Sequence, residues 1–244
     1  MKYKLSLCYD GGRYKGWQKQ KSTDNTVQGK IEAVLTKLLD QPVEISGCGR
    51  TDAGVHARFQ VCSFAVDTDM NCGDILDGLR TYLPEDIGAI SLEAVNDRFH
   101  ARLSCKEKTY VYRIWNADTP NVFERKYTYR HPQPLNIEEM RKAAEQLVGT
   151  HDFISFSSVK KSKKTTVRSI YKIEIEKADD VVSIAITGNG FLYNMVRIIA
   201  GTLIEAGEGK RDAGSIREIL DGKRRESAGF TAPSCGLFLW DIKY

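Results

Sequence analysis

The segment ISGCGRTDAGVHAR, residues 45–58, gathers residue types that can do chemistry within a glycine-rich stretch. It holds one carboxylate, Asp52, with Arg50 and Arg58 on either side. Apolar stretches that alternate like strands flank the segment, so we expect the carboxylate at the end of a sheet. A carboxylate in a partly dry cleft stays ionised only if a cation or hydrogen-bond donors offset its desolvation. The segment is therefore a candidate site for a catalytic carboxylate.

Three other interpretations of this segment compete with catalysis. Gly47, Gly49 and Gly54 suggest a dinucleotide loop, but their spacing is too long for that turn and no crossover helix follows. The Cys, Asp and His side chains within residues 48–62 fit no zinc spacing. The third is a tight turn in which glycines supply positive φ and Asp52 hydrogen-bonds its own turn. Residue types and spacing leave the turn and the catalytic carboxylate both open.

Arg197 is a second candidate, at the end of GNGFLYNMVR, residues 188–197. Its neighbours are apolar with helical spacing, which can bring the guanidinium into an apolar setting where a lone charge is costly. A buried arginine there would need a carboxylate partner. The alternative is that the long side chain reaches the surface.

Tyr110 and Tyr112 form a third candidate, in KTYVYRIW, residues 108–115. They share one face of a predicted strand, which is typical of a core stripe. An aromatic ring at a strand end near a basic cleft can also stack on an unpaired base. This segment alone does not decide between the two.

Basic residues occur in short clusters on a chain whose net charge is only +4. Such runs are usually solvated, but several of them together indicate a polarised surface suited to phosphates. The densest cluster, in a probable loop, supplies the candidate contacts to an RNA backbone: Lys160, Lys161, Lys163, Lys164 and Arg168. Further clusters occur within residues 210–211 and 223–225.

Hydrophobic periodicity predicts the elements that position these residues. Strands are expected at residues 3–9, 42–46, 58–66, 88–95, 108–115, 167–176, 181–187 and 235–242, and helices at 26–38, 75–82, 136–149, 191–206 and 215–220. The order repeats, which predicts an α+β fold of two similar halves, each a mainly antiparallel sheet with helices on one face. We expect the sheets to join across a central cleft. The predicted domains are residues 1–102, with the Asp52 loop, and 103–244, with the tyrosine strand and the arginine helix.

The composition is that of a globular protein: 244 residues, of which 41% are hydrophobic and 28% charged. The six cysteines form no C-x-x-C pair, so free thiols are expected. The N-terminus lacks the apolar core of a signal peptide and no run is long enough to span a bilayer. These features predict a cytoplasmic protein with no membrane association.

GRTDAGVHA, residues 49–57, resembles the active-site motif of the TruA family of tRNA pseudouridine synthases. The resemblance extends along the chain through YDGGRYKGWQKQ, TVQGKIE, FHAR, KTYVYRI, GTHDFISF, GNGFLYNMVR and GTL. It implies that Asp52 is the catalytic carboxylate, that Tyr110 contacts the target uridine and that Arg197 pairs with Asp52. Arg50 would help to hold the displaced nucleotide or its place in the stem. The resemblance also implies one continuous sheet, a homodimer, and uridines at positions 38 to 40 of the tRNA anticodon arm as substrates.

The isomerisation of uridine to pseudouridine involves no net redox change and no hydrolysis, so no cofactor or metal is expected. It requires a carboxylate beside the sugar, which either attacks C1′ or removes the C2′ proton. Both routes stay open for Asp52. The alternative function is a non-catalytic RNA-binding protein of two sheet modules, in which Asp52 is only a turn residue. A nucleotide-dependent enzyme of another class is a third hypothesis.

Overall fold

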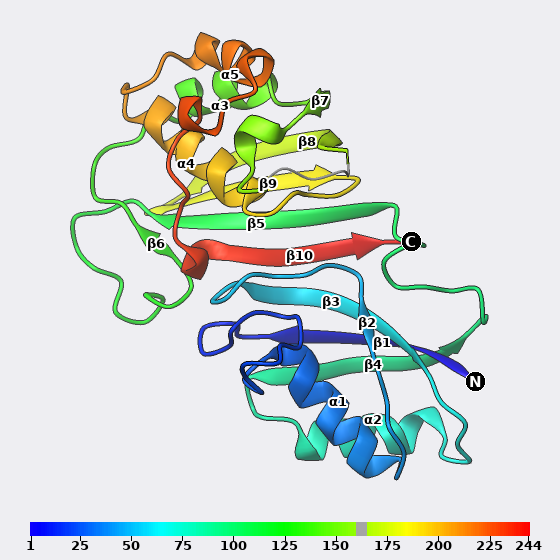
Figure 1. Ribbon diagram of the computed structural model, residues 1–244. Helices are drawn as coiled ribbons and strands as arrows, with labels where there is room; N and C mark the ends of the chain where they lie inside the picture. Colours follow the sequence, from blue (N-terminus) through cyan, green and yellow to red (C-terminus); the bar gives the residue numbers. More distant parts are fainter. Residues whose placement is uncertain (160–164) are drawn as a thin grey trace. The chain divides into compact units, whose positions relative to one another are not determined.

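The computed structural model describes residues 1–159 and 165–244 (Figure 1). Internal contacts divide the chain into two compact units: unit 1 is Met1–Lys106 with Phe238–Tyr244, and unit 2 is Glu107–Leu237. The sequence had placed the last strand with the second half because it follows that half in the chain. The strand belongs to unit 1 because Phe238 and Leu239 pair, in parallel, with His56 and Ala57.

Unit 1 is built on a mostly antiparallel sheet with the order β4-β1-β3-β10. The central strand β1 pairs antiparallel with both β3 and β4, and the short β2 pairs antiparallel with β3. The strands are β1 (Lys2–Tyr9), β2 (Ser46–Gly47), β3 (His56–Ala65), β4 (Ile87–Val95) and β10 (Leu237–Lys243). The helices are α1 (Val27–Leu38) and α2 (Cys72–Tyr82).

The strand predicted at residues 42–46 is wrong for most of its length, since only its last residue lies in β2. Val43 and Ile45 are buried as the apolar alternation suggested. Their backbone N–H groups, however, donate to side chains of α1 rather than to a neighbouring strand. Val43 N–H donates to Thr36 Oγ1 at 3.1 Å, and Ile45 N–H donates to Glu32 Oε1 at 3.1 Å. Residues 42–45 therefore form an extended segment that packs on α1 and is not part of the sheet.

The helix α1 follows from an N-cap and an apolar stripe. Thr26 accepts a hydrogen bond from Gly29 N–H at 3.2 Å, which satisfies one of the free donors of the first turn. Val27, Ile31 and Leu35 recur at helical spacing and are fully buried. The helix α1 packs against α2, and α2 packs against β4. The core of unit 1 thus lies between its sheet and these helices.

Unit 2 is also an α+β unit, with an antiparallel sheet in the order β5-β9-β8-β7. The short strand β6 pairs in parallel with the end of β5. The strands are β5 (Glu107–Trp115), β6 (Tyr129–Arg130), β7 (Gly149–Asp152), β8 (Val167–Ala178) and β9 (Val181–Gly188). The helices are α3 (Ile137–Glu145), α4 (Met195–Gly207) and α5 (Ile216–Gly222). The alternation expected within residues 181–187 is confirmed in β9, whose residues are alternately buried.

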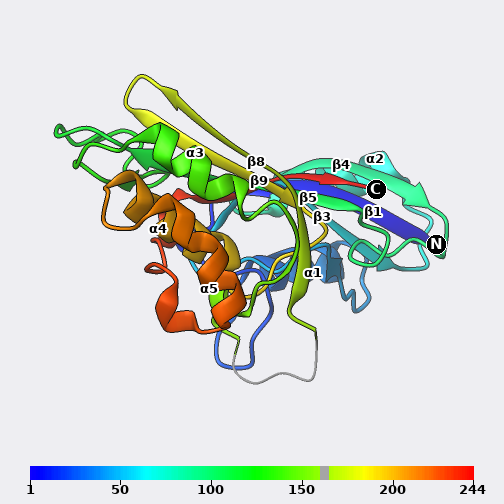
Figure 2. The same ribbon diagram turned by 90° about the horizontal axis from the view of Figure 1, so that it is seen from above.

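The helices of unit 2 lie together on one side of β8 and β9 (Figure 2). The side chain of Asn136 caps α3 by accepting hydrogen bonds from the N–H groups of Glu138 and Glu139. The helix α4 begins at Met195, later than predicted, because Asn194 has a left-handed φ of 61° and interrupts the helical backbone. The helix α3 packs on α4 and β8, and α4 packs on β5.

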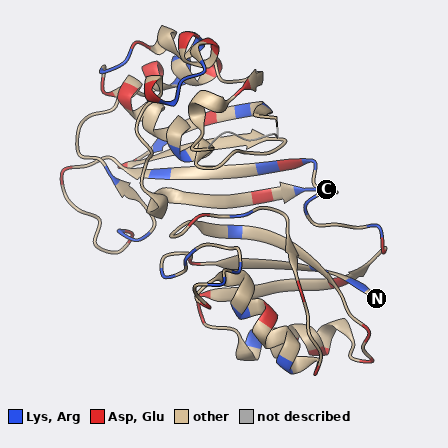
Figure 3. Cartoon of the chain, in the orientation of Figure 1, with Lys and Arg blue, Asp and Glu red and all other residues tan. Residues whose placement is uncertain are grey.

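Charged side chains of both signs are mixed along the helices of each unit (Figure 3). The helix α1, for example, carries Lys30, Glu32 and Lys37, and α5 carries Arg217, Glu218 and Asp221. Among the residues that the structure describes, none of the helices has the length and apolarity needed to cross a membrane.

Candidate active site

Asp52 lies in a tight turn that leads into β3, and its side chain is half-buried. Val55 N–H donates to Asp52 C=O at 3.1 Å, and Gly54, the third residue of the turn, has a φ of +77°. A positive φ at this position strongly favours glycine. Gly47 is constrained differently: a Cβ there would lie 2.6 Å from the Trp17 ring. The turn interpretation therefore holds for the backbone at Asp52.

The loop after β1 clamps this turn from both sides of Asp52. Before Asp52, Trp17 N–H donates to Thr51 C=O at 3.0 Å, and the hydroxyls of Tyr9 and Thr51 are hydrogen-bonded at 2.8 Å. After it, Gly54 N–H donates to Tyr14 C=O at 3.4 Å. The backbone around Asp52 is therefore fixed by neighbouring segments.

Two glycines allow the clamp to close. A Cβ on Gly11 would lie 1.9 Å from Val55 O, so no larger residue fits without moving backbone. Gly16 has a φ of +97°, and a Cβ there would lie 2.8 Å from Thr51 O. These close approaches give a structural reason for the glycines of YDGGRYKGW, residues 9–17.

His56 ties the same loop to the first residue of β3, a role that the sequence reasoning missed because it considered His56 only as a metal ligand. The side chain is 1% exposed and its ring stacks on Phe238 with centroids 4.8 Å apart. Gly11 N–H donates to His56 Nδ1 at 3.1 Å, and Asp10 Oδ1 lies 3.0 Å from the same nitrogen. A lone pair on Nδ1 accepts from Gly11 N–H, whereas a proton on Nδ1 would be donated to Asp10, so the two contacts call for different forms of the ring.

Metal binding finds no support in the side chains whose positions are described: no cluster of three or more His, Cys, Asp or Glu is arranged to hold an ion. All six cysteines lie within the described residues, and none of them is in a disulfide there.

The two arginines that flank Asp52 in the sequence differ in their surroundings. Arg50 is exposed in the loop before the turn. Arg58 lies on β3 with its guanidinium carbon 4.9 Å from the centre of the Trp240 ring, a cation–π contact within unit 1. Arg58 therefore has a local partner on the strand next to its own.

In unit 2, Tyr110 and Tyr112 have distinct environments although both lie on β5. Tyr112 is fully buried, and its hydroxyl donates to Pro233 C=O at 2.9 Å. Burial raises the pKa of Tyr112 well above its usual value, so it stays a neutral core residue. Tyr110 is 8% exposed and meets the ring of Phe191 edge-on, with centroids 5.2 Å apart. The core-stripe interpretation fits Tyr112, and Tyr110 has an aromatic neighbour that orients its ring.

Arg197 is half-buried in the first turn of α4 and is held by a return segment, residues 228–235, that runs beside this helix. Its Nε donates to Ala232 C=O at 2.7 Å, and Nη1 donates to Asn194 Oδ1 at 3.0 Å. Ala232 N–H donates in turn to Arg197 C=O at 3.1 Å. The guanidinium is thus oriented by uncharged acceptors in its own unit.

The predicted backbone-binding residues divide into two sets. Lys160, Lys161, Lys163 and Lys164 lie outside the described residues. Arg168 is half-buried in unit 2, and its Nη1 donates to the carbonyl oxygens of Thr165 at 3.0 Å and Val167 at 2.6 Å. Among the predicted site residues, Asp52 and Arg50 belong to unit 1, and Tyr110, Arg168 and Arg197 belong to unit 2.

A clamped aspartate turn on one α+β unit, and a tyrosine strand with an arginine helix on another, define a two-unit protein built on mainly antiparallel sheets. A family model described as tRNA pseudouridine synthase matches residues 7–104 and 143–244. The chain belongs to the tRNA pseudouridine synthase family. The matched segments contain Arg50, Asp52 and Arg197, while Tyr110 lies between them.

Curated relatives resemble the chain over its whole length. A Bacillus cereus protein named tRNA pseudouridine synthase A 2 is 46% identical over 242 residues, covering 99% of each chain. A Clostridium tetani protein named tRNA pseudouridine synthase A 1 is 47% identical over 241 residues, covering 99% of this chain and 98% of its own. These matches support the TruA family, and with it an enzyme of the isomerase class.

Solved structures add only a weak likeness. One of an H/ACA RNP bound to a substrate RNA containing 2'-deoxyuridine covers 83% of this chain and 43% of its own, with 12% identity and a TM-score of 0.39. That score is too low to carry an argument about function.

Proposed function

We propose that this enzyme converts uridine to pseudouridine in the anticodon stem-loop of tRNA, at positions 38 to 40, with Asp52 as the catalytic carboxylate. The observation that carries this proposal is the clamp on the Asp52 turn. Three hydrogen bonds hold the residues on both sides of Asp52. Trp17 N–H donates to Thr51 C=O, and Gly54 N–H donates to Tyr14 C=O. The Tyr9 hydroxyl is hydrogen-bonded to the Thr51 hydroxyl. Several hydrogen bonds that fix the position of one residue are expected where reacting atoms must be placed to within a fraction of an ångström.

Asp52 has two chemically balanced routes. If the carboxylate attacks C1′, the N1–C1′ bond breaks and the freed uracil carries the electron pair away. The ring then rotates, and C5 forms the new bond to C1′ as the carboxylate leaves. If Asp52 instead removes the C2′ proton, the N1–C1′ bond breaks as uracil leaves and a glycal forms, and the same proton returns to C2′ after C5 has bonded to C1′. In both routes a base finally takes the C5 proton while N1, which left the sugar with the electron pair, is protonated. The redox state does not change, so we propose no cofactor.

Tyr110 is the proposed contact for the target uracil. A uridine in a stem must leave the helix to be reached, which costs a few kcal/mol, and stacking on an aromatic ring returns roughly 1 to 3 kcal/mol. The edge-on contact with Phe191 supports this role because it holds the Tyr110 ring in one orientation. Arg50, which is exposed, is the proposed contact for the displaced nucleotide or its place in the stem.

Arg197 is the proposed cation that keeps Asp52 ionised after RNA has excluded water. Its hydrogen bonds to Ala232 and Asn194 leave its charge intact, because neither acceptor is anionic. We therefore expect Arg197→Ala to lower kcat more than it lowers tRNA affinity. An equal loss in both would argue for a role in RNA binding alone.

The proposed partners are tRNA and a second copy of the chain, in the cytoplasm. Lys160, Lys161, Lys163, Lys164 and Arg168 are the proposed contacts to the tRNA backbone. Each phosphate that they neutralise makes binding more sensitive to salt. Light scattering of the purified protein tests the homodimer.

Asp52→Asn tests the central proposal. We expect no detectable pseudouridine at positions 38 to 40 when purified tRNA is incubated with this variant, while the unmodified protein produces it without added metal or nucleotide. Asp69→Asn, at an exposed loop carboxylate of the same unit, is the matched control and should keep full activity. Filter binding checks that Asp52→Asn still binds tRNA. Activity retained by Asp52→Asn would refute the assignment.

A further inference from the structure

The helix α1 carries a polar pair on its buried side. Gln28 and Glu32 lie about one helical turn apart, and both are buried. Gln28 Nε2 donates to Glu32 Oε1 at 2.8 Å. Polar side chains stay buried only where hydrogen bonds offset the loss of water, so the partners of this pair indicate its role. Neither residue takes part in the chemistry proposed for Asp52.

Glu32 joins two segments that lead towards the Asp52 turn. Its Oε1 also accepts from Ile45 N–H at 3.1 Å, and its Oε2 accepts from Lys19 Nζ at 3.1 Å. Together with Gln28, these donors offset the desolvation of the carboxylate. The Lys19 side chain is 60% exposed, so water can replace Glu32 as its partner. The bond to Ile45 is buried, and losing it would leave that N–H unsatisfied.

The side-chain amide of Gln28 uses its full hydrogen-bonding capacity. Nε2 donates to Ile45 C=O at 3.1 Å as well as to Glu32. Oε1 accepts from Lys19 N–H at 3.1 Å and from Gln18 Nε2 at 2.7 Å. An amide offers two donors and two acceptor sites, and all four are paired here. A reversed amide would face Lys19 N–H with a donor and Ile45 C=O with an acceptor, so one orientation is fixed.

Trp17 connects this network with the Asp52 turn. Gln28 N–H donates to Trp17 C=O at 3.0 Å, and Trp17 N–H donates to Thr51 C=O at 3.0 Å. The Trp17 side chain is buried. Residues 18–19, which the Gln28 amide holds, follow Trp17 directly. Two backbone hydrogen bonds therefore link α1 to the residue before Asp52.

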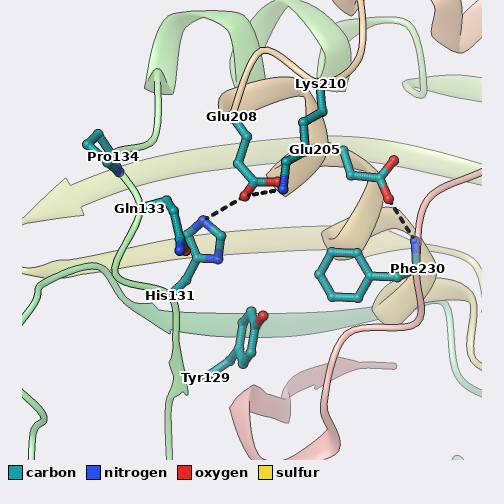
Figure 4. Close-up of a pocket in the computed structure, with 8 residues that line it drawn as sticks. All are labelled: Tyr129, His131, Gln133, Pro134, Glu205, Glu208, Lys210 and Phe230. Atoms are coloured by element: carbon teal, nitrogen blue, oxygen red, sulfur yellow. Dashed lines mark hydrogen bonds and ion pairs between the residues drawn. The ribbon is translucent and has the colours of Figure 1, made fainter.

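Unit 2 holds a backbone segment in a similar way, in the wall of the pocket drawn in Figure 4. Glu205 on α4 accepts from Phe230 N–H at 3.2 Å through one oxygen and from Arg211 through the other. Phe230 lies in the return segment that holds Arg197. In both units a helix carboxylate, paired with a basic side chain, accepts a backbone N–H from another segment of its unit. The side chain of Glu32 is 5% exposed and that of Glu205 is 22% exposed, so the network of unit 1 is the better shielded from water.

We propose that Gln28 and Glu32 are positioning residues for the reaction at Asp52. They fix Trp17 and Ile45, and Trp17 in turn holds the residue before Asp52. The bonds of the pair run to residues 17–19 and 45, so the effect passes through the loop backbone. It should therefore appear in kcat rather than in KM for tRNA. The inference rests on the catalytic role proposed for Asp52.

Gln28→Met removes the amide and keeps a side chain of similar length. We expect kcat for pseudouridine formation to fall about 10- to 100-fold at an unchanged KM for tRNA, because the turn shifts by up to about 1 Å. Ile31→Val, which removes one buried carbon from the same helix, is the matched control: it lowers stability but should keep kcat. An unchanged kcat in folded Gln28→Met, or a loss that lies in KM, would overturn the proposal.

Glu32→Gln and Glu32→Met separate the backbone bond from the ion pair. The glutamine keeps an Oε1 that can accept from Gln28 and from Ile45 N–H, and gives up only the bond to exposed Lys19. We expect Glu32→Gln to keep most of kcat, whereas Glu32→Met should lose about tenfold or more. Equal kcat in the two variants, whether lowered or not, would contradict a positioning role.

Hydrogen exchange of the free protein tests the same route without catalysis. The N–H groups of Trp17 and Gly54 bond on either side of Asp52. We expect them to exchange at least roughly tenfold faster in Gln28→Met than in Ile31→Val. Equal exchange in these two variants would rule out transmission through Trp17.

Gln18→Met serves in place of Gln28→Met if the latter does not fold. It removes a single bond of the network, at a half-buried residue, and should change kcat and exchange in the same direction by a smaller factor. Unchanged values of both in Gln18→Met would then refute the assignment.

Failure here and failure of the catalytic proposal can be told apart. If Asp52→Asn abolishes activity while Gln28→Met keeps kcat, Asp52 is catalytic and the network only stabilises the fold. If Asp52→Asn keeps activity, the catalytic assignment fails whatever the exchange rates show.

Discussion

In each unit a glycine lets two backbone segments come very close, but the two units fix their candidate residues in different ways. In unit 1 the loop after β1 approaches the Asp52 turn, and a Cβ on Gly11 would lie 1.9 Å from Val55 O. In unit 2 the return segment, residues 228–235, approaches α4, and a Cβ on Gly201 would lie 1.9 Å from Phe230 O. The steric requirement is the same in both places. What is held differs: the backbone around Asp52 in one unit, and the guanidinium of Arg197 in the other.

This difference suits the two proposed roles. A reacting carboxylate needs a fixed backbone position and a side chain that can still reach the substrate, so contacts to the neighbouring residues suffice. A cation that acts on another charge needs its own charged group fixed, and uncharged carbonyl acceptors do this without neutralising it. Replacing the close-contact glycine by alanine should therefore mainly lower kcat in unit 1 and mainly lower stability in unit 2.

Gly11→Ala is expected to have the largest effect. The new methyl group meets backbone rather than a flexible side chain, so the loop and the Asp52 turn must separate. A displacement near 1 Å costs about 100-fold in rate, and we expect a loss of that size in kcat for pseudouridine formation. Gly12→Ala is the control, since its Cβ would meet side-chain atoms and not backbone: Asp10 Oδ1 at 3.0 Å and His56 Cε1 at 4.0 Å. Equal activity of the two variants would mean that the clamp does not position Asp52.

Gly201→Ala tests the corresponding contact in unit 2. The overlap with Phe230 O should cost about 1 to 3 kcal/mol of stability, partly offset by about 1 kcal/mol from better helix propensity. We therefore expect a lower midpoint in urea unfolding. Gly222→Ala, at the end of α5 with no atom within 4 Å of its Cβ, should be neutral or slightly stabilising. A stable Gly201→Ala protein would show that the return segment yields easily.

Much of the fold could be predicted from the sequence because periodicity reports burial directly. The stripe of Val27, Ile31 and Leu35 located α1, and alternation located β1, β8 and β9. Prediction failed where the backbone found partners that periodicity does not encode. Val43 and Ile45 alternate like a strand, yet their N–H groups bond to side chains of α1.

The site could be predicted only in part, for a related reason. The Asp52 motif is local and readable, and Gly54 has the positive φ that the turn interpretation required. The pairing of β10 with β3, and the contact of Gly11 with Val55, join residues far apart in the sequence. His56 was missed because its partners, Asp10 and Phe238, lie at distant positions in the chain. The glycines near Tyr9 were the readable signal that a close approach was needed.

Tyr9 in unit 1 and Tyr112 in unit 2 each make one hydroxyl hydrogen bond to the segment that is held. Tyr9 shares a hydrogen bond with Thr51 at 2.8 Å beside the Asp52 turn, and Tyr112 donates to the C=O of Pro233, in the return segment, at 2.9 Å. We expect Tyr9→Phe and Tyr112→Phe each to lose about 1 kcal/mol of stability, measured by urea unfolding. Only Tyr9→Phe should also reduce kcat. A larger kcat loss in Tyr112→Phe would reverse the assignment of the two clamps.

The smallest expected effect concerns acid stability and arises in unit 2. Burial holds the pKa of His131 below 6.5, while Glu208 raises it and Lys210 lowers it further. In the unfolded chain the imidazole takes up a proton as the pH falls through about 6.5, and in the folded protein it resists. The stability due to neutral His131 is therefore present above pH 6.5 and is lost as the pH falls through the lower, folded pKa.

His131→Asn should flatten this acid dependence between pH 7 and pH 5, by at most about one proton in the slope of stability against pH. Urea unfolding at several pH values measures it. An unchanged slope in His131→Asn would mean that Glu208 keeps the histidine as easily protonated in the folded protein as in the unfolded chain.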